Sequence, residues 1–174
     1  MKIYFATHAT STDNEAKRSS GWKDVELSEK GKKQAKELRE IFKNIKIDLI
    51  CCSDLRRAVD TAKIAFGDSI PILIDWRLNE INYGKSNGAP SENVEPMKKE
   101  HIKEPFPNGE SYEQAVARII GFYKWLKIAH PDKKTVLAVG HRATQYGLDI
   151  LNGKTIEELL SIPFKWKPYW EYEI

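Results

Sequence analysis

The sequence predicts an α/β fold, a three-layer sandwich with a mostly parallel central sheet and helices on both faces. Three apolar runs that stop abruptly in polar residues carry the prediction: residues 2–8 (KIYFATH), 48–58 (DLICCSDLRRA) and 135–143 (TVLAVGHRA). Continuous apolar character is typical of strands buried on both faces. Helical patterns lie between these runs and supply the crossovers that parallel strands require.

The first crossover is a helix in residues 27–42 (LSEKGKKQAKELREIF). Ser28 is placed to cap its N-terminus, because a serine oxygen can accept a hydrogen bond from a free amide of the first turn. The apolar positions recur at helical spacing and mark the buried face: Ala35, Leu38, Ile41 and Phe42. These residues and the flanking runs predict a β-α-β unit.

Two further helices follow the same logic. The second apolar run leads into a helical pattern over residues 56–66, with Ser53 or Asp54 as the expected cap. Ser111 and Gln114 form a capping box ahead of what we expect to be the longest helix.

The remaining segments are less regular. We predict one domain over residues 1–174, with a substrate-facing insertion at about 68–109 that lies over one end of the sheet. Within the insertion only residues 70–74 (IPILI) look like a strand, and a helix is expected around 91–101. The tail alternates apolar and polar residues from Lys167 onwards, which favours an edge strand.

Composition narrows the class of protein. The 28 basic and 25 acidic residues are spread along the chain, and no apolar stretch is long enough to cross a bilayer, so we expect neither nucleic acid nor a membrane as a partner. The N-terminus does not resemble a signal peptide, which makes the cytoplasm the expected location. Cys51 and Cys52 are adjacent in a strand and therefore point to opposite faces as buried, reduced thiols. Whether the chain forms a homodimer stays open.

Polar side chains follow the ends of all three predicted strands. They are His8, then Ser53 and Arg57, then His141 and Arg142. One histidine after a strand is more often structural, but the carboxyl ends of parallel strands meet at one edge, where such folds bind ligands. An arginine in the first turn of a helix matches phosphate oxygens with its planar fork. The set predicts a phosphate cradle.

Competing sites lack their motifs. The chain has no G-x-x-x-x-G-K-[ST] loop, no G-x-G-x-x-G after a strand, no G-x-S-x-G elbow and no H-E-x-x-H. His8 and His141 have no obvious carboxylate or thiolate set around them, so we expect no metal.

Several segments together resemble the histidine phosphatase superfamily, also called the phosphoglycerate mutase-like family. Residues 7–14 (THATSTDN) are similar to its R-H-G-[EQ]-T-x-x-N signature. Further resemblances follow in the family's order over almost the whole chain: GWKDVELSEKGKKQA, CSDLRRAVDTA, RLNEINYGKSNG, PNGESYEQAVAR and VLAVGHRATQYGL. The resemblance implies a phosphoglycerate mutase-like fold.

It also implies a mechanism on a small phosphorylated metabolite, without metal or cofactor. By this resemblance His8 attacks phosphorus and carries the phosphoryl group, and Glu80 protonates the leaving oxygen and then activates water. Arg57, Asn14 and His141 would bind the phosphoryl oxygens, and Ser11 aligns with the motif threonine in the same loop.

The chain departs from the signature beside the nucleophile. Thr7 stands where the family has arginine, Ala9 where it has glycine, and Arg142 replaces the glycine after the second histidine. A charge-assisted hydrogen bond is worth about 1.5–3 kcal/mol, and one oxyanion donor about a hundredfold to a thousandfold in rate. We hypothesise that Arg142 supplies the guanidinium lost at Thr7.

Three functions compete. A phosphatase is favoured because the implied catalytic groups are all present, whereas phosphoglycerate mutases are longer. A weakened or inactive phosphate-binding protein is the alternative, for which Thr7 and Ala9 argue. A protein-interaction module would use the aromatic tail, but we expect Trp166, Tyr169 and Trp170 to pack as core and edge-strand residues.

Overall fold

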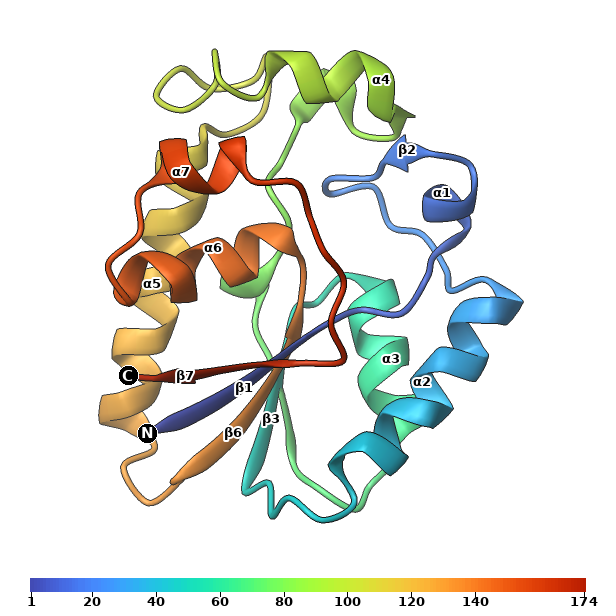
Figure 1. Cartoon of the computed structure of the whole chain (residues 1–174), viewed down its shortest axis with the longest axis vertical. Coiled ribbons are helices and arrows are strands. Elements are labelled where there is room, and N and C mark those ends of the chain that lie inside the picture. Colours follow the sequence, from blue (N-terminus) through green and yellow to red (C-terminus); the bar gives the residue numbers. More distant parts are fainter.

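The computed structural model describes residues 1–174 and confirms the three-layer α/β prediction (Figure 1). The central sheet has five strands in the order β4-β3-β6-β1-β7. All pair in parallel except β7, which runs antiparallel to β1 at the edge. The strands of this sheet are β1 (Lys2–Thr7), β3 (Leu49–Cys52), β4 (Ile72–Ile74), β6 (Thr135–Gly140) and β7 (Trp170–Glu173).

Helices cover both faces of the sheet. The helices are α1 (Thr12–Glu15), α2 (Glu29–Phe42), α3 (Arg56–Phe66), α4 (Ser91–Val94), α5 (Tyr112–Ala129), α6 (Arg142–Leu151) and α7 (Ile156–Ser161). Short 3-10 turns occupy Trp76–Leu78, Gly84–Ser86 and Glu95–Met97. A separate two-stranded sheet pairs β2 (Arg18–Ser19) with β5 (Ala89–Pro90).

Alternation along the strands divides the core in two. In β1, Ile3 and Phe5 join the cluster packed under α5 and α6, whereas Tyr4 and Ala6 join the cluster under α2 and α3. Figure 1 shows these helix pairs on opposite sides of the sheet. Burial on both faces explains why the strands have unbroken apolar sequences.

The three helices predicted outside the insertion form, but the predicted N-cap of α3 and the predicted burial of Ile41 in α2 are wrong. Ser28 caps α2, and the Ser111–Gln114 capping box begins α5, the longest helix. The expected Ser53 or Asp54 cap of α3 is wrong: Leu55 is the N-cap, and Asp24 accepts the hydrogen bond from the Arg56 amide. Ile41 is exposed on α2 because it lies on the flank of the apolar stripe.

The insertion contains less helix than predicted. The strand predicted in residues 70–74 forms as β4. In place of the helix expected around 91–101, the chain forms the short helix α4, which ends at Val94, and then a 3-10 turn at Glu95–Met97. Pro96 explains the break, because proline has no amide hydrogen for a helical bond and its ring clashes with the preceding turn. Through β2 and β5, this segment is tied to the loop that follows α1.

The tail is an edge strand as predicted, but not all of its aromatic residues are buried. Trp170 and Tyr172 of β7 pack against the core, and Tyr169 packs against the opposite cluster. Trp166 is 66% exposed, so the prediction that it packs in the core is wrong. It precedes β7 in a segment without regular structure. Cys51 and Cys52 are buried free thiols, as predicted.

Two helical glycines give a matched test of the α5–α6 packing. A Cβ on Gly147 of α6 would lie 2.3 Å from the buried Ile119 side chain, whereas a Cβ on Gly121 of α5 would meet nothing within 4 Å. We expect Gly147→Ala to lower the free energy of unfolding by about 1–3 kcal/mol through overpacking. Gly121→Ala should raise it by about 0.5–1 kcal/mol. Urea denaturation of both variants measures this; equal effects would contradict the packing described.

Candidate active site

Strand register brings the predicted site residues together. Thr7 at the end of β1 pairs with Gly140 at the end of β6, so the next residues, His8 and His141, leave the sheet side by side. Cys52 of β3 pairs with Val139, which places Ser53 at the same edge. The ring centroids of His8 and His141 are 5.0 Å apart.

His8 is held with one ring nitrogen free. Its Nδ1 lies 2.7 Å from the carbonyl oxygen of Ala9, which can only accept, so Nδ1 carries the proton and Nε2 keeps a lone pair. Burial, with a smaller contribution from the nearby Arg57 charge, lowers the pKa of His8 to about 3. The ring is therefore neutral near pH 7, as a nitrogen nucleophile must be.

His141 is fixed by a chain of polar side chains. Its Nε2 lies 2.8 Å from Ser53 Oγ, which donates to Asn79 Oδ1, while Asn79 Nδ2 donates to Asp54. The serine proton is thereby used, so Nε2 of His141 is the donor in its bond to Ser53. The other nitrogen, Nδ1, is buried and has no hydrogen-bond partner. Burial and the Arg57 charge hold the pKa of His141 well below its usual range.

Arg57 brings a buried positive charge to the same edge. Its side chain projects from the first turn of α3, as predicted, and the residue is 1% exposed. The guanidinium donates to the carbonyl oxygens of Gly21 and Lys23 and has no carboxylate within salt-bridge distance. Burial lowers its pKa. An unpaired buried cation is costly and favours an anion beside it.

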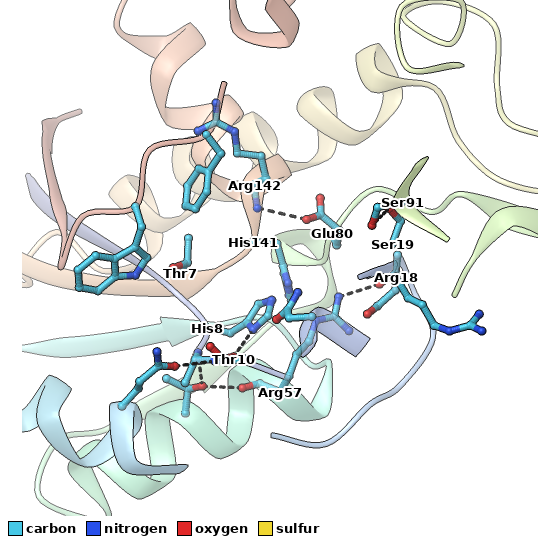
Figure 2. Close-up of a pocket in the computed structure, with 18 of the residues that line it drawn as sticks. Thr7, His8, Thr10, Arg18, Ser19, Arg57, Glu80, Ser91, His141 and Arg142 are labelled. Carbon is cyan, nitrogen blue, oxygen red and sulfur yellow. Dashed lines mark hydrogen bonds between the residues drawn. The ribbon is translucent and has the colours of Figure 1, made fainter. Parts of the chain in front are cut away.

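Glu80 lies across the site at the N-terminus of α6. Its carboxylate accepts hydrogen bonds from the amides of Ile81, Arg142 and Ala143. Arg118 of α5 donates to the carbonyl oxygens of residues 77, 79 and 80, and so fixes the loop that carries the carboxylate. In Figure 2 a dashed line joins the Glu80 carboxylate to the Arg142 amide, next to His141.

These groups line one cavity of about 670 Å³. Thr7, His8, Asn14, Arg57, Glu80 and His141 all contribute to its wall. Asn14 accepts from the Ser11 amide through Oδ1, which leaves its Nδ2 group to donate. Ser11 itself is fully buried, does not line the cavity and caps α1.

Known proteins share this arrangement of elements. The model of the histidine phosphatase superfamily (branch 1) matches residues 3–163. The chain belongs to this superfamily.

Three relatives show how far the likeness extends. A 2,3-bisphosphoglycerate-dependent phosphoglycerate mutase of Lactococcus lactis is 42% identical over 93 residues, which are 50% of this chain and 40% of the mutase. The Bacillus stearothermophilus protein YhfR superposes with a TM-score of 0.84 at 26% identity, covering 99% of this chain and 91% of its own. A mycobacterial glucosyl-3-phosphoglycerate phosphatase superposes with a TM-score of 0.82 at 24% identity, covering 98% and 90%. The chain thus spans less than half the length of the curated mutase it matches.

In this superfamily member, Arg142 is not directed at the nucleophile. Its side chain rises along the cavity wall away from His8 (Figure 2). The guanidinium bonds to Gln145 and Tyr146 and lies over the rings of Tyr146 and Phe164. To take the place of the motif arginine, it would have to leave these partners.

Several further residues line the cavity. Phe164, Trp166 and Pro168 come from the tail, Arg18 lies in β2, Ser91 begins α4, and Lys98 follows the 3-10 turn at Glu95–Met97. The sequence of the aromatic tail suggests an interaction surface as one alternative, but it does not indicate the place of the tail in the cavity wall. Nothing local in the sequence marks Arg118 as the residue that holds the Glu80 loop.

No group of three or more His, Cys, Asp or Glu side chains is arranged to hold a metal ion. None of the helices combines the length and apolar character that crossing a bilayer requires.

The burial of His8 predicts that its ring does not take up a proton in the usual pH range of histidine. The imidazole nitrogen shifts of His8, assigned with His8→Asn, should stay constant from about pH 8 to about pH 5, because its pKa lies near 3. A midpoint near 6.5 would contradict the burial described. The unfolded chain protonates this ring below about pH 6.5 and the folded chain does not. The stabilisation that the neutral, buried His8 ring provides is therefore complete above about pH 6.5, and the free energy of unfolding decreases as the pH falls toward 3.

Proposed function

We propose that the chain is a phosphomonoester hydrolase that acts on a small phosphorylated metabolite through a phosphohistidine on His8. The observation that carries the proposal is the hydrogen bond from His8 Nδ1 to the Ala9 carbonyl, which leaves Nε2 unprotonated beside the unpaired Arg57 charge. Membership of the superfamily supports a hydrolase, since phosphatases occur among the structural neighbours.

In the first half-reaction, the lone pair on His8 Nε2 forms a bond to phosphorus and the bond to the ester oxygen breaks. Glu80, in its protonated form, gives a proton to the departing oxygen, so the alcohol leaves neutral. The contact of Glu80 with three backbone amides fixes the carboxyl group in the wall of the cavity that His8 and His141 also line.

In the second half-reaction, the Glu80 carboxylate takes a proton from water, and the hydroxide attacks phosphorus as the bond to His8 breaks. Phosphate leaves, and Glu80 is protonated for the next cycle. One carboxyl group acts in both directions because the leaving oxygen and the water occupy the same side of phosphorus.

Charge on the phosphoryl oxygens would be met by Arg57, Asn14 and His141. A dianion beside His141 would favour protonation of its unpartnered Nδ1 and turn that atom into a donor. The cations of the chain then provide the electrostatic stabilisation that a metal ion supplies in other phosphoryl-transfer sites.

Thr7 supports a second candidate, a protein of this fold that binds phosphorylated metabolites and turns them over slowly or not at all. Thr7 lines the cavity where the family motif has arginine. Mutase activity is less well supported: the matched mutase is more than twice as long as the aligned part of this chain, whereas the phosphatase structure is covered almost completely.

The role of Glu80 as a general acid can be tested with substrates whose leaving groups differ in their need for a proton. Glu80→Gln should lower kcat/KM for alkyl phosphates by about a hundredfold to ten-thousandfold and for dinitrophenyl phosphate far less, because a stable phenolate needs no proton. Values of kcat/KM for both substrates measure this, since they report the first half-reaction alone, whereas kcat also contains the attack of water that Glu80 assists as a base. His8→Asn is the control and should remove turnover of both, together with the acid-labile, base-stable phosphate found on quenched wild-type protein. Equal loss for both esters in Glu80→Gln would contradict general acid catalysis.

Thr7→Arg separates the two candidates. If the missing guanidinium limits the rate, Thr7→Arg should raise kcat/KM toward the roughly hundredfold effect of one oxyanion donor, while Thr7→Val should not. Measurements on phenyl phosphate give both values. A Thr7→Arg protein that binds vanadate but remains without turnover would favour the binding protein.

A further inference from the structure

Arg142 forms a second cationic position in the cavity, apart from the Arg57 charge. Its guanidinium carbon lies 4.9 Å from the Tyr146 ring centroid and 5.1 Å from that of Phe164. Its Nε donates to the Tyr146 hydroxyl over 3.2 Å, and one terminal nitrogen donates to Gln145 Oε1 over 2.9 Å. Four contacts therefore fix a long side chain that would otherwise be mobile.

The partner of Arg142 is itself held in place. Gln145 Nε2 donates to the Tyr172 hydroxyl, which in turn donates to Asp149. Since the amide nitrogen of Gln145 is used in this way, its oxygen must face Arg142. Asp149 is paired with Lys154, so its charge is already matched. The network runs from β7 and α6 to the cavity wall and orients the guanidinium.

None of the partners of the Arg142 guanidinium is an anion. No carboxylate lies within salt-bridge distance of it, although 12 salt bridges occur elsewhere in the chain. A guanidinium has five N–H donors, and two are used here. The remaining three can bind a planar or tetrahedral oxyanion through two parallel bonds.

We propose that Arg142 binds a second oxyanion, a carboxylate or a second phosphate, on the leaving group of the substrate. The inference rests on the proposed function, because it takes the phosphoryl group to lie at His8. Arg142 and His8 line one cavity, and Arg142 points away from the nucleophile (Figure 2). A molecule bound at both positions carries an anion at each end. Phe164 and Trp166 supply an apolar wall for the carbon skeleton between them.

The other cations of the cavity are less suited to this task. Lys98 is paired with Glu95, and the Arg18 guanidinium donates to the Gly88 carbonyl from an exposed position. Arg142 has neither a paired charge nor an exposed side chain.

Binding of non-hydrolysable phosphonates tests the proposal without requiring turnover. Calorimetry compares ω-carboxyalkyl phosphonates of increasing length with the matching terminal carboxamides, and a parallel series carries a second phosphonate. In the wild type, the charged member of the best-fitting pair should bind about tenfold to a hundredfold more tightly than the neutral one. Whichever acid shows the larger preference identifies carboxylate or phosphate as the second group.

Arg142→Gln should abolish this preference and leave the affinity for the carboxamide unchanged, while Arg142→Lys should keep part of it. Arg39→Gln, which removes an exposed charge outside the cavity, should leave the preference intact. Thermal unfolding of each variant shows that it is folded. A preference that survives in Arg142→Gln, or that disappears only in Arg18→Gln, overturns the proposal.

Turnover separates this inference from the proposed function. If His8→Asn hydrolyses phosphate esters as fast as the wild type, the phosphohistidine mechanism fails, whereas the phosphonate preference still decides the role of Arg142. If His8→Asn is inactive and Arg142→Gln prefers charged over neutral esters as strongly as the wild type does, only the Arg142 assignment fails.

Discussion

The parallel pairing of β1 and β3 with β6 is the constraint on which the site depends. Amide and carbonyl groups continue the ladder past the strands: the His8 amide donates to Gly140 and the Ser53 amide to Val139. These bonds hold the backbone of His8 and Ser53 beside the end of β6, where His141 follows, independently of any side-chain contact. A slip of one residue would reverse which side chains face each half of the core, so the register is set by the whole apolar sandwich. The relative positions of His8, Ser53 and His141 are therefore determined by the packing of the core, because the core sets the strand register.

The electrostatic character of the site follows from that edge being buried. Arg57 has only carbonyl partners, and both histidines are neutral because burial and the arginine charge disfavour their protonation. The part of the cavity beside the histidines thus contains the unmatched Arg57 cation, a free lone pair on His8 and an unpartnered nitrogen on His141. A phosphoryl group would match the Arg57 charge, offer its phosphorus to the His8 lone pair and favour protonation of the His141 nitrogen into a donor. The buried cation is costly without such an anion, so the arrangement is suited to one.

Much of this could be predicted from the sequence because it depends on local rules. Apolar runs identified the strands, Ser28 and Ser111 marked helix starts, and the parallel sheet implied that His8 and His141 lie at one edge. The α3 cap could not be predicted, because Asp24 reaches Arg56 from a distant loop and Ser53 is used by His141. The contact of Arg118 with the Glu80 loop and the place of Trp166 in the cavity wall could not be predicted for the same reason. Both depend on how loops fold over the sheet, and the spacing of residues along the chain gives no information about that.

The two departures from the motif lie on different parts of the cavity and have different physical consequences. At position 142 the backbone amide donates to Glu80 while the side chain turns toward Tyr146 and Phe164, so an arginine can replace glycine there without disturbing the carboxylate. A cation beside the phosphoryl group gains strength as charge develops in the transition state. A cation on a distant oxyanion meets the same charge throughout the reaction and stabilises bound substrate and transition state equally. In the proposed arrangement, losing arginine at position 7 therefore lowers kcat, whereas gaining it at 142 lowers KM for doubly anionic substrates. The chain would then select its substrate by the leaving group more than by the phosphate that all such substrates share.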